Sequence, residues 1–230
     1  MGERAGEIAA RVIAGETIVY CSDAGMPGVS DPGLRLVHVA REAGAPVEVL
    51  PGPTAVATAY VASGTTSTSF YFGGFFPRKD AARKQLLDSL KSLDAALVFY
   101  ESPNRLVSAL TTIAESLPYR DIAVCRELTK LHEEVVRGSV DEVKRQFESR
   151  ESIKGEIVFV IDAPNNEEMR AAIASASASA EERAVELLAQ GERPKLVAKT
   201  IAEEFGISRN EAYEMVLAKK GQLQSGHQAE

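Results

Sequence analysis

The chain has 230 residues, of which 45% are hydrophobic and 26% are charged, and its formal net charge is −7. This balance is typical of a globular protein of one or two domains, and no apolar stretch in the sequence is long enough to span a membrane. The acidic charge argues against nucleic-acid binding over the whole surface, because phosphate contacts require clustered Lys and Arg.

The first predicted element is a buried parallel strand at residues 17–21, an apolar run rich in β-branched residues. It leads into the segment 22–33, which concentrates Gly and Pro. Open α/β sheets bind ligands at the carboxyl ends of their strands, and Gly lets the backbone approach a ligand closely. A tight structural turn is the alternative, but a turn needs fewer Gly and Pro. The segment is therefore predicted to be a ligand-binding loop.

The next predicted element is a helix at 34–43, with Asp31 at its N-cap and Pro32 in its first turn. A second short strand at 47–50 is broken at once by Pro51. Thr54 is then predicted to cap an Ala-rich helix.

From residue 70 onward, predicted strands and helices alternate. An aromatic strand at 70–72 runs into a segment at 73–79 that combines Phe with Arg and Lys. The later elements are a basic helix at 80–93, a strand at 95–100, a helix at 104–117, a strand at 121–125, a polar stretch at 126–138, a helix at 140–149 and a strand at 156–161. This succession predicts an α/β protein with largely parallel strand pairing.

The last part of the chain is predicted to be helical. The Ala/Ser-rich run at 171–180 is predicted to be a linker or a weakly held helix. Two helices follow within 194–220, and Ser208 with Glu211 forms a capping box that opens the second helix. Their pattern is typical of a helix-turn-helix that binds nucleic acid and, equally, of two helices that only pack against each other.

These features predict five segments along the chain. They are an N-terminal α/β subdomain at 1–66, a second α/β subdomain at 67–163, an Ala/Ser linker at 164–180, a helix-turn-helix-like module at 181–221 and a disordered tail at 222–230. The ligand-binding loop belongs to the first segment.

Cysteine and histidine usage predicts a cytoplasmic protein without a metal site. Cys21 and Cys125 each end a predicted strand and are expected to be small buried side chains. The three His are scattered along the chain, without the spacing of metal ligands.

Six motifs occur in order along the chain. They are S-D-A-G-M-P-G-V-S-D-P-G at 22–33, P-G-P-T-A at 51–55, G-G-F-F-P-R-K at 73–79, Y-E-S-P-N-R at 100–105, R-E-L-T-K-L-H-E-E at 126–134 and K-G-E-I-V at 154–158. Together they resemble the ribosomal RNA small subunit methyltransferase I family, within the tetrapyrrole methylase superfamily. The resemblance spans about residues 15–163, with a weaker similarity at 190–221.

The resemblance implies an S-adenosylmethionine-dependent enzyme that methylates the ribose 2′-hydroxyl of a decoding-centre cytidine in 16S rRNA, either free or within the 30S subunit. It also implies a homodimer of two-subdomain protomers with the cofactor in the cleft between subdomains. The residues it assigns to the cofactor are Ser22, Asp23, Ala24, Gly25, Pro27, Thr54, Ala55, Tyr100, Glu101, Glu127, Leu128, Gly155 and Glu156. An Asx turn onto Gly25 is an alternative use of Asp23.

Two residues are predicted to assist the transfer. A ribose hydroxyl is a poor nucleophile while protonated, so a nearby base or cation would help it lose its proton. Lys130 is predicted to lower the pKa of that hydroxyl, and Glu101 to position it. A solvated loop with internal ion pairs is the alternative for any member of the segment that contains Lys130.

Aromatic and basic side chains are predicted to form the RNA-binding surface. Aromatic rings stack on unpaired bases, and Lys and Arg hold phosphates. Strand alternation predicts that one of Phe75 and Phe76 is buried. The residues predicted to contact RNA are Phe75, Arg78, Lys79, Arg83, Lys84 and Arg105.

The start of the chain departs from the family pattern. Family members open with a strand that carries a T-P-I-G-N loop, and this sequence starts inside the helix before residue 17, without that block. The block would supply the first strand and one wall of the pocket, so its absence is expected to expose a strand edge and apolar surface. Two other functions stay open: a tetrapyrrole C-methyltransferase, and a non-catalytic remnant that dimerises or binds RNA without turnover.

Overall fold

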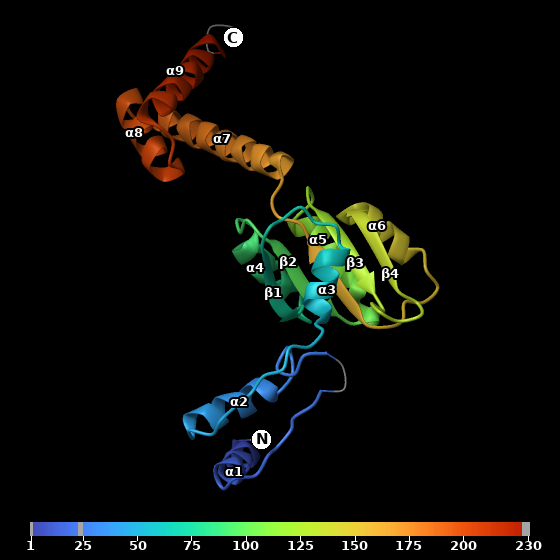
Figure 1. Ribbon diagram of the computed structural model, residues 1–230. Helices are drawn as coiled ribbons and strands as arrows, with labels where there is room; N and C mark the ends of the chain where they lie inside the picture. Colours follow the sequence, from blue (N-terminus) through green and yellow to red (C-terminus); the bar gives the residue numbers. More distant parts are fainter. Residues whose placement is uncertain (1, 23–24, 227–230) are drawn as a thin grey trace. The chain divides into compact units, whose positions relative to one another are not determined.

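The computed structural model describes residues 2–22 and 25–226. The chain forms two compact units, Met1–Pro164 and Asn165–Glu230. The first unit contains a mixed β-sheet with helices on both of its faces, and the second unit is helical (Figure 1).

The first unit is built on a five-stranded sheet in the order β1-β2-β5-β3-β4. The strands are β1 (Phe70–Phe75), β2 (Ala96–Glu101), β3 (Asp121–Arg126), β4 (Glu134–Ser139) and β5 (Ile157–Ile161). Only β1 and β2 pair in parallel, whereas β5 is antiparallel to both β2 and β3, and β4 is antiparallel to β3. The predicted, largely parallel pairing is therefore wrong.

The physical reason lies in β4, which falls inside the stretch predicted to be polar loop. β4 is an edge strand whose side chains are all at least partly exposed, so no apolar run marks it in the sequence. Its connection to β3 is too short for a crossover helix, so the two strands form an antiparallel pair.

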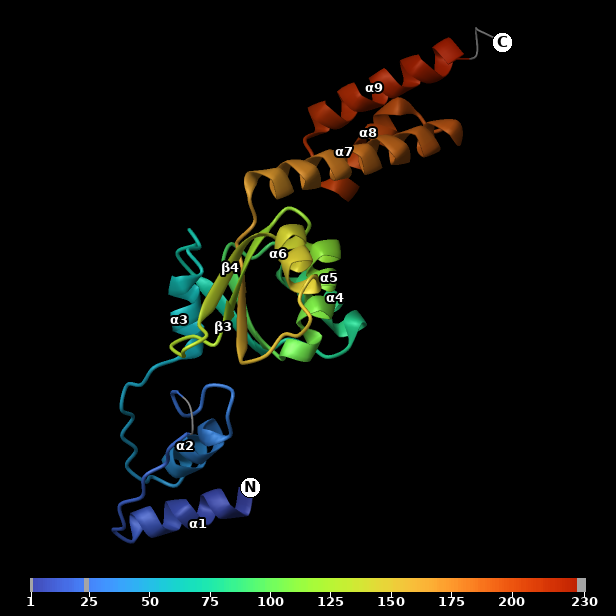
Figure 2. The same ribbon diagram turned by 90° about the vertical axis from the view of Figure 1, so that its right-hand side faces the viewer.

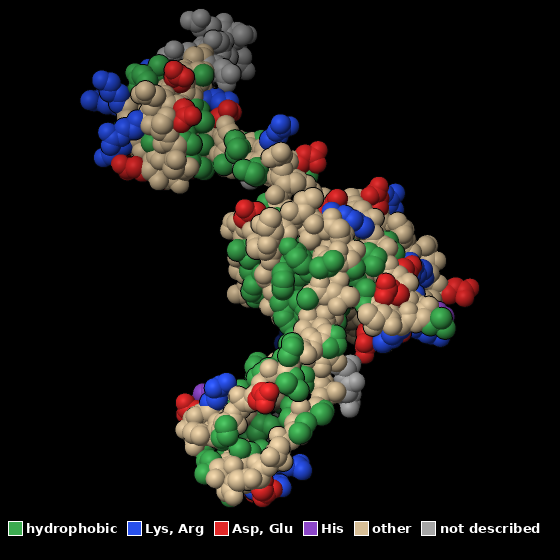
Figure 3. Space-filling model, viewed as in Figure 1, with side chains coloured by type: hydrophobic (Ala, Val, Ile, Leu, Met, Phe, Trp, Pro, Cys, Tyr) green, Lys and Arg blue, Asp and Glu red, His purple; other side chains and the backbone are tan. Residues whose placement is uncertain are grey.

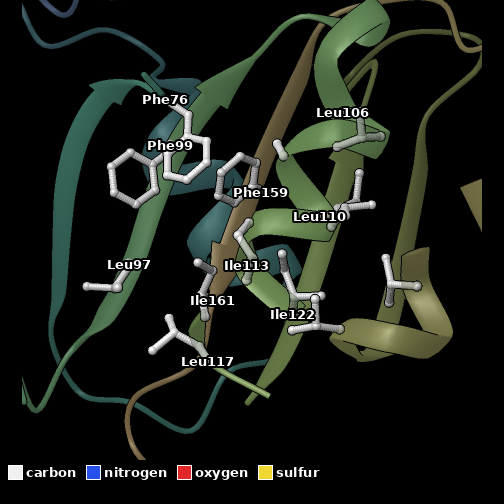
Figure 4. Close-up of a cluster of buried hydrophobic side chains, with 14 of the residues drawn as sticks. Phe76, Leu97, Phe99, Leu106, Leu110, Ile113, Leu117, Ile122, Phe159 and Ile161 are labelled. Atoms are coloured by element: carbon white, nitrogen blue, oxygen red, sulfur yellow. The ribbon is translucent and has the colours of Figure 1, made fainter. Parts of the chain in front are cut away.

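One face of the sheet carries the larger hydrophobic core. It is covered by α4 (Asp80–Leu90), α5 (Leu106–Ser116) and α6 (Val140–Glu148), with a short 3₁₀ turn, η1 (Pro103–Arg105), before α5 (Figure 2). Phe99 and Phe159 from adjacent strands meet Phe76, and Leu110 and Ile113 of α5 close over them (Figure 4).

The opposite face is covered by α3 (Ala55–Ala62), whose Val56 and Ala59 pack on the sheet (Figure 2). Thr54 caps this helix, as predicted, because its Oγ1 accepts a hydrogen bond of 3.1 Å from the Ala57 N–H. Cys125 lies in this core and is buried, as predicted. Burial raises the pKa of its thiol to about 11.

The N-terminal segment contains α1 (Gly2–Ile13) and α2 (Gly33–Glu42), which pack together through Ala9 and Ala40. The predicted strands at 17–21 and 47–50 are extended but belong to no sheet among the described residues, so this prediction is wrong. An apolar β-branched run becomes a strand only where a partner strand accepts its hydrogen bonds. Cys21 is exposed rather than buried for the same reason.

The second unit consists of α7 (Asn166–Ala189), α8 (Pro194–Phe205) and α9 (Arg209–Gly226) around a core of small and β-branched side chains. The Ala/Ser-rich run lies within α7, which agrees with the helical alternative. Ser208 and Glu211 form the predicted capping box, with N–H to side-chain distances of 3.0 and 3.2 Å. The helix they open extends into the segment expected to be a disordered tail, whose residues 227–230 lie outside the described part.

Across the described ranges, no helix combines the length and apolarity that a membrane crossing requires. The same ranges hold no cluster of three or more His, Cys, Asp or Glu side chains that could bind a metal ion.

Candidate functional site

The candidate site lies at one edge of the sheet, where three of the predicted motifs meet. The strand register aligns Glu101 of β2 with Ile157 of β5, and Ile157 with Arg126 of β3. The carboxyl ends of β2 and β3 and the start of β5 therefore share this edge. The structure thus brings together Tyr100, Glu127, Leu128, Gly155 and Glu156, which lie far apart in the sequence.

The turns after β3 and before β5 are bound to each other through their backbones. The Glu127 N–H donates to the Glu156 carbonyl at 2.9 Å, and the Glu156 N–H donates to Glu127 Oε1 at 2.8 Å. Gly155 has φ +95°, and a Cβ there would lie 2.4 Å from Cγ of Glu127. Glycine is therefore required at 155 for the two turns to approach this closely.

The side chain of Lys130 joins the same two turns. Its Nζ lies 2.9 Å from Glu127 Oε1 and 3.1 Å from Glu156 Oε2. These hydrogen bonds, first to Glu127 and then to Glu156, raise the pKa of Lys130 above its ordinary value. The ammonium is therefore a fixed cation rather than a base. These ion pairs are the ones expected from the alternative prediction for this segment, a solvated loop with internal ion pairs. The Lys130 ammonium nevertheless lies at the sheet edge where the motifs meet.

Tyr100 lies on the face of the sheet that α3 covers. Its side chain packs against the α3-face core, as does the side chain of Leu128. Burial, and secondarily the Glu156 carboxylate, raises the pKa of the Tyr100 phenol, which therefore stays protonated. Tyr100 also contacts exposed Phe75 in an edge-to-face geometry, with ring centroids 5.4 Å apart.

Glu101 points to the opposite face, because successive side chains of a strand alternate. Its carboxylate is fully buried and pairs with Arg105 at 2.5 Å and Arg83 at 3.6 Å, and it accepts a hydrogen bond from the Ser102 N–H. The prediction that Glu101 positions the substrate or contacts the cofactor through its side chain is therefore wrong. Its carboxylate instead holds the turn after β2.

Arg83 is the second correction. Its side chain is buried, its Nε donates to the Pro77 carbonyl at 2.7 Å, and its Nη1 donates to Ser108 Oγ at 2.9 Å. The guanidinium also lies over the ring of Phe76. Arg83 therefore joins α4 to α5 and is not available to RNA. Its place in a basic run of the sequence gave no sign of this use.

The other predicted RNA contacts divide into neutralised and free cations. Lys84 pairs with Glu115 at 2.9 Å and with Asp80 at 3.2 Å, and Arg105 pairs with Glu101. Arg78 and Lys79 are exposed and form no ion pair within the described ranges. Phe75 is 62% exposed whereas Phe76 is 1% exposed, which confirms that one of the two is buried. Phe75 is thus an exposed ring against Tyr100, and Arg78 and Lys79 follow it closely in the chain as exposed cations.

The Gly/Pro-rich loop contributes to the α3 face. Asp23 and Ala24 lie outside the described residues, and the account of the loop begins at Gly25. The Met26 N–H donates to the Pro53 carbonyl at 2.8 Å, which joins the loop to the motif that precedes α3. Val29 packs against the α3-face core, and Ser30 Oγ lies 3.7 Å from the position of a Cβ on Gly74. The loop therefore reaches β1 near its carboxyl end.

Asp31 has the structural role that the sequence predicts, although not as N-cap. Its Oδ1 accepts hydrogen bonds from the Gly28 N–H at 2.6 Å and from the Gly33 N–H at 2.7 Å, which fixes the loop into α2. The N-cap position of α2 is Pro32.

Glu134, on the edge strand β4, is not among the residues that the sequence predicts for the site. Its carboxylate binds Arg150 at 2.7 Å and Arg126 at 2.9 Å. Hydrogen bonds from Arg150, and then from Arg126, lower the pKa of Glu134 to about 2. This network fixes the end of β3 next to the site. The mixture of charges in the 126–134 motif was the only available signal.

Comparison with known proteins gives this arrangement a context. The family described as Tetrapyrrole (Corrin/Porphyrin) Methylases matches residues 1–144. A protein of Halalkalibacterium halodurans named "Ribosomal RNA small subunit methyltransferase I" is 37% identical over 202 residues, which cover 88% of this chain and 70% of that protein. A protein of Mycobacterium bovis with the same name is 41% identical over 209 residues, which cover 90% of this chain and 70% of that protein.

Among solved structures, the methyltransferase CobJ is similar with a TM-score of 0.53 and 20% sequence identity, over 71% of this chain and 76% of that chain. At this identity the similarity concerns the fold alone. It agrees with the mixed sheet and the two helical layers described above.

Proposed function

The chain belongs to the tetrapyrrole methylase family, and from this membership we propose that it is a methyltransferase that uses S-adenosylmethionine to methylate small-subunit ribosomal RNA. The proposed acceptor is the 2′-hydroxyl of a cytidine at the decoding centre. The chain spans 63–70% of the length of the first relatives it matches, so substrate and partners are part of the proposal. We propose further that the enzyme is a cytoplasmic homodimer that acts on free RNA or on the 30S subunit.

The observation that carries the proposal is the convergence on one face of the sheet. The Gly/Pro-rich loop, the ring of Tyr100 and the turns at 127–128 and 155–156 come from four separate parts of the chain. Close backbone packing at Gly155, next to an apolar face, suits a ligand with both a flat ring and polar groups. These features support a cofactor site formed by the 127–128 and 155–156 turns, Tyr100 and the Gly/Pro-rich loop.

Bound S-adenosylmethionine would supply a methyl group on a cationic sulfur. The role proposed for the chain is to orient the ribose oxygen and to stabilise its negative charge. Lys130 is proposed for the second task because its ammonium remains protonated and because Glu127 and Glu156 occupy only two of its three N–H donors, which leaves one for the ribose oxygen. A fixed cation beside a hydroxyl favours the deprotonated form and so lowers its pKa.

The proposed RNA contacts are Phe75, Arg78 and Lys79. The exposed Phe75 ring could stack on an unpaired base, and the two unpaired cations could hold phosphates. The contact of Phe75 with Tyr100 would place the stacked base next to the proposed cofactor site.

The test is transfer of a radiolabelled methyl group from S-adenosylmethionine to small-subunit RNA, followed by mass spectrometry of the nucleosides. The expected product is 2′-O-methylcytidine. Methyl transfer to a porphyrinoid but not to RNA would refute the proposal and identify a tetrapyrrole C-methyltransferase. Cofactor binding without transfer to free RNA or to 30S subunits would indicate a non-catalytic protein.

A further inference from the structure

The second unit carries a basic groove that the proposed methyl-transfer site does not use. The groove lies between α8 and α9 and is lined by Lys195, Ala198, Lys199, Arg209, Asn210 and Tyr213. Figure 3 shows Lys and Arg side chains gathered on the side of this unit where α8 lies. This is a local concentration, because Asp and Glu outnumber Lys and Arg in residues 165–230 as a whole.

Helical spacing aligns the polar side chains along the groove. Lys195 and Lys199 are four residues apart on α8, and Arg209 and Tyr213 are four residues apart on α9, so each pair lies on one helix face. The floor is formed by the small side chain of buried Ala198. The groove therefore has a small apolar floor, with three cations and one aromatic ring on its walls.

The cations of the groove are poorly neutralised. Lys195 and Arg209 are exposed and have no ion-pair partner among the described residues, and Lys199 reaches Glu203 only at 3.9 Å. By contrast, Arg183 and Lys219 elsewhere in this unit form ion pairs at 2.6 Å. The charge of the groove is thus available to an external anion.

The combination of three cations with one aromatic ring indicates what kind of anion the groove binds. We propose that the α8–α9 groove binds a single strand of RNA, with phosphates on Lys195, Lys199 and Arg209 and a base stacked on Tyr213. Tyr213 is 37% exposed, and an exposed ring among cations is the arrangement that binds unpaired bases. Asn210 adds a hydrogen-bonding amide. An acidic protein segment would use the cations but would gain nothing from the aromatic ring.

The groove would give the enzyme a second contact to its RNA, separate from the sheet edge. The inference rests on the proposed function only in the choice of RNA as partner. It is tested by RNA binding without cofactor, so its failure is distinguishable from a failure of methyl transfer.

The experiment uses the full chain and a fluorescent single-stranded RNA of about 20 nucleotides, long enough for several phosphate contacts. The variant K195Q/K199Q/R209Q is compared with the wild type by anisotropy over a range of salt concentrations. Each lost phosphate contact removes about 0.7 from the slope of log affinity against log salt, so we expect the slope to fall by about 2. Arg170→Gln is the matched control, because Arg170 is an exposed cation of the same unit outside the groove.

Tyr213 provides an independent readout. Tyr213→Ala should weaken binding roughly fivefold to a hundredfold through loss of stacking, without a change in the salt slope. Tyr213→Phe should retain most of the affinity. Circular dichroism and thermal unfolding verify that each variant is folded.

Two results would overturn the inference. One is a triple variant that binds RNA with the affinity and salt slope of the wild type. The other is a triple variant that keeps its RNA binding but loses binding to a poly-glutamate peptide, which would assign the groove to an acidic protein segment.

Discussion

At the scale of single residues, the fate of each charged side chain depends on its neighbours in space. Arg78 and Arg83 belong to the same basic run, yet Arg78 is exposed and Arg83 is buried against Glu101 and Ser108. Glu101 ends β2 and Glu127 directly follows β3, but Glu101 is enclosed under two arginines whereas Glu127 holds Lys130 at the site edge. Residue type and position in the chain therefore do not tell a buried charged side chain from an exposed one in either pair.

Lys130 allows a direct test of the proposed chemistry. Lys130→Ala should reduce kcat for RNA methylation about a hundredfold, because the fixed cation near the hydroxyl is lost. Lys130→Arg should restore part of the rate. The control is Lys154→Ala, which removes an exposed lysine from the turn before β5. Equal kcat values for Lys130→Ala and the wild type would show that Lys130 does not activate the ribose hydroxyl.

Gly155 allows a test of the turn itself. A Cβ there would meet the Glu127 side chain at 2.4 Å, and φ is +95°. Gly155→Ala should therefore weaken S-adenosylmethionine binding at least about fivefold in calorimetry, since a strained backbone position is worth about 1–3 kcal/mol. Gly44→Ala is the control, because Gly44 also has a positive φ but has open space around it. Similar losses of affinity in both variants would contradict a specific role for residue 155.

At the scale of elements, the sheet places the motifs, and the direction of each strand decides which motifs meet. β2 and β3 both end at the edge where β5 begins, because β5 lies between them and runs antiparallel to both. Had β5 been parallel to its neighbours, its preceding turn would lie at the other edge, away from Tyr100. The β3–β4 pair adds Glu134, whose arginine partners fix the end of β3.

The helix pair α4–α5 gives a prediction about stability. Arg83→Ala would leave the buried Glu101 carboxylate with one cation fewer, and removing one partner of a buried ion pair costs about 3–5 kcal/mol. The midpoint of urea unfolding should fall accordingly. The matched variant Arg78→Ala should leave that midpoint unchanged and lower only the affinity for RNA. Weaker RNA binding by Arg83→Ala at full stability would instead show that Arg83 contacts RNA.

At the scale of the whole molecule, each of the two units has its own hydrophobic core. The proposed methyl-transfer site belongs to the first unit, and the basic groove belongs to the second. Binding and transfer can therefore be impaired separately, which is why the experiments on the two sites use different readouts.

Glu134 makes a definite contribution to the pH dependence of stability. Its pKa is lowered to about 2 in the folded chain from an ordinary value of 4.5. A carboxylate with a depressed pKa contributes stability that is complete above the ordinary value and is lost as pH falls toward the folded value. Glu134→Gln should therefore destabilise the protein at pH 7, as measured by urea unfolding, with the difference from wild type vanishing near the folded pKa of about 2. Exposed Glu151→Gln is the control and should change stability little at either pH.

The sequence predicted the elements of the sheet core well, but it did not predict the directions in which the strands pair. Strands at 95–100, 121–125 and 156–161 and the helices between them are confirmed, because buried apolar runs and helical periodicity are local signals. The strands at 17–21 and 47–50 were predicted from the same signal and are wrong, since pairing requires a partner that the local pattern does not report. The edge strand β4 lacks an apolar run and was missed.

For the candidate site, the motifs identified the turns that meet at the sheet edge, and the family they indicated is the family of the chain. The two members that failed, Glu101 and Arg83, failed together because they neutralise each other in the core. A buried ion pair between residues of separate elements leaves no trace in the spacing of either residue.

The sequence by itself determined the local features: helix caps at Thr54 and Ser208, the burial of one of Phe75 and Phe76, and the α/β class with a helical C-terminal part. Each depends on hydrogen bonds or side-chain alternation within a few residues. Only the tertiary structure decided the strand directions, which face of the sheet carries Tyr100 and which carries Glu101, and which cations stay free to bind RNA. These depend on contacts between residues far apart in the chain, which no local pattern encodes.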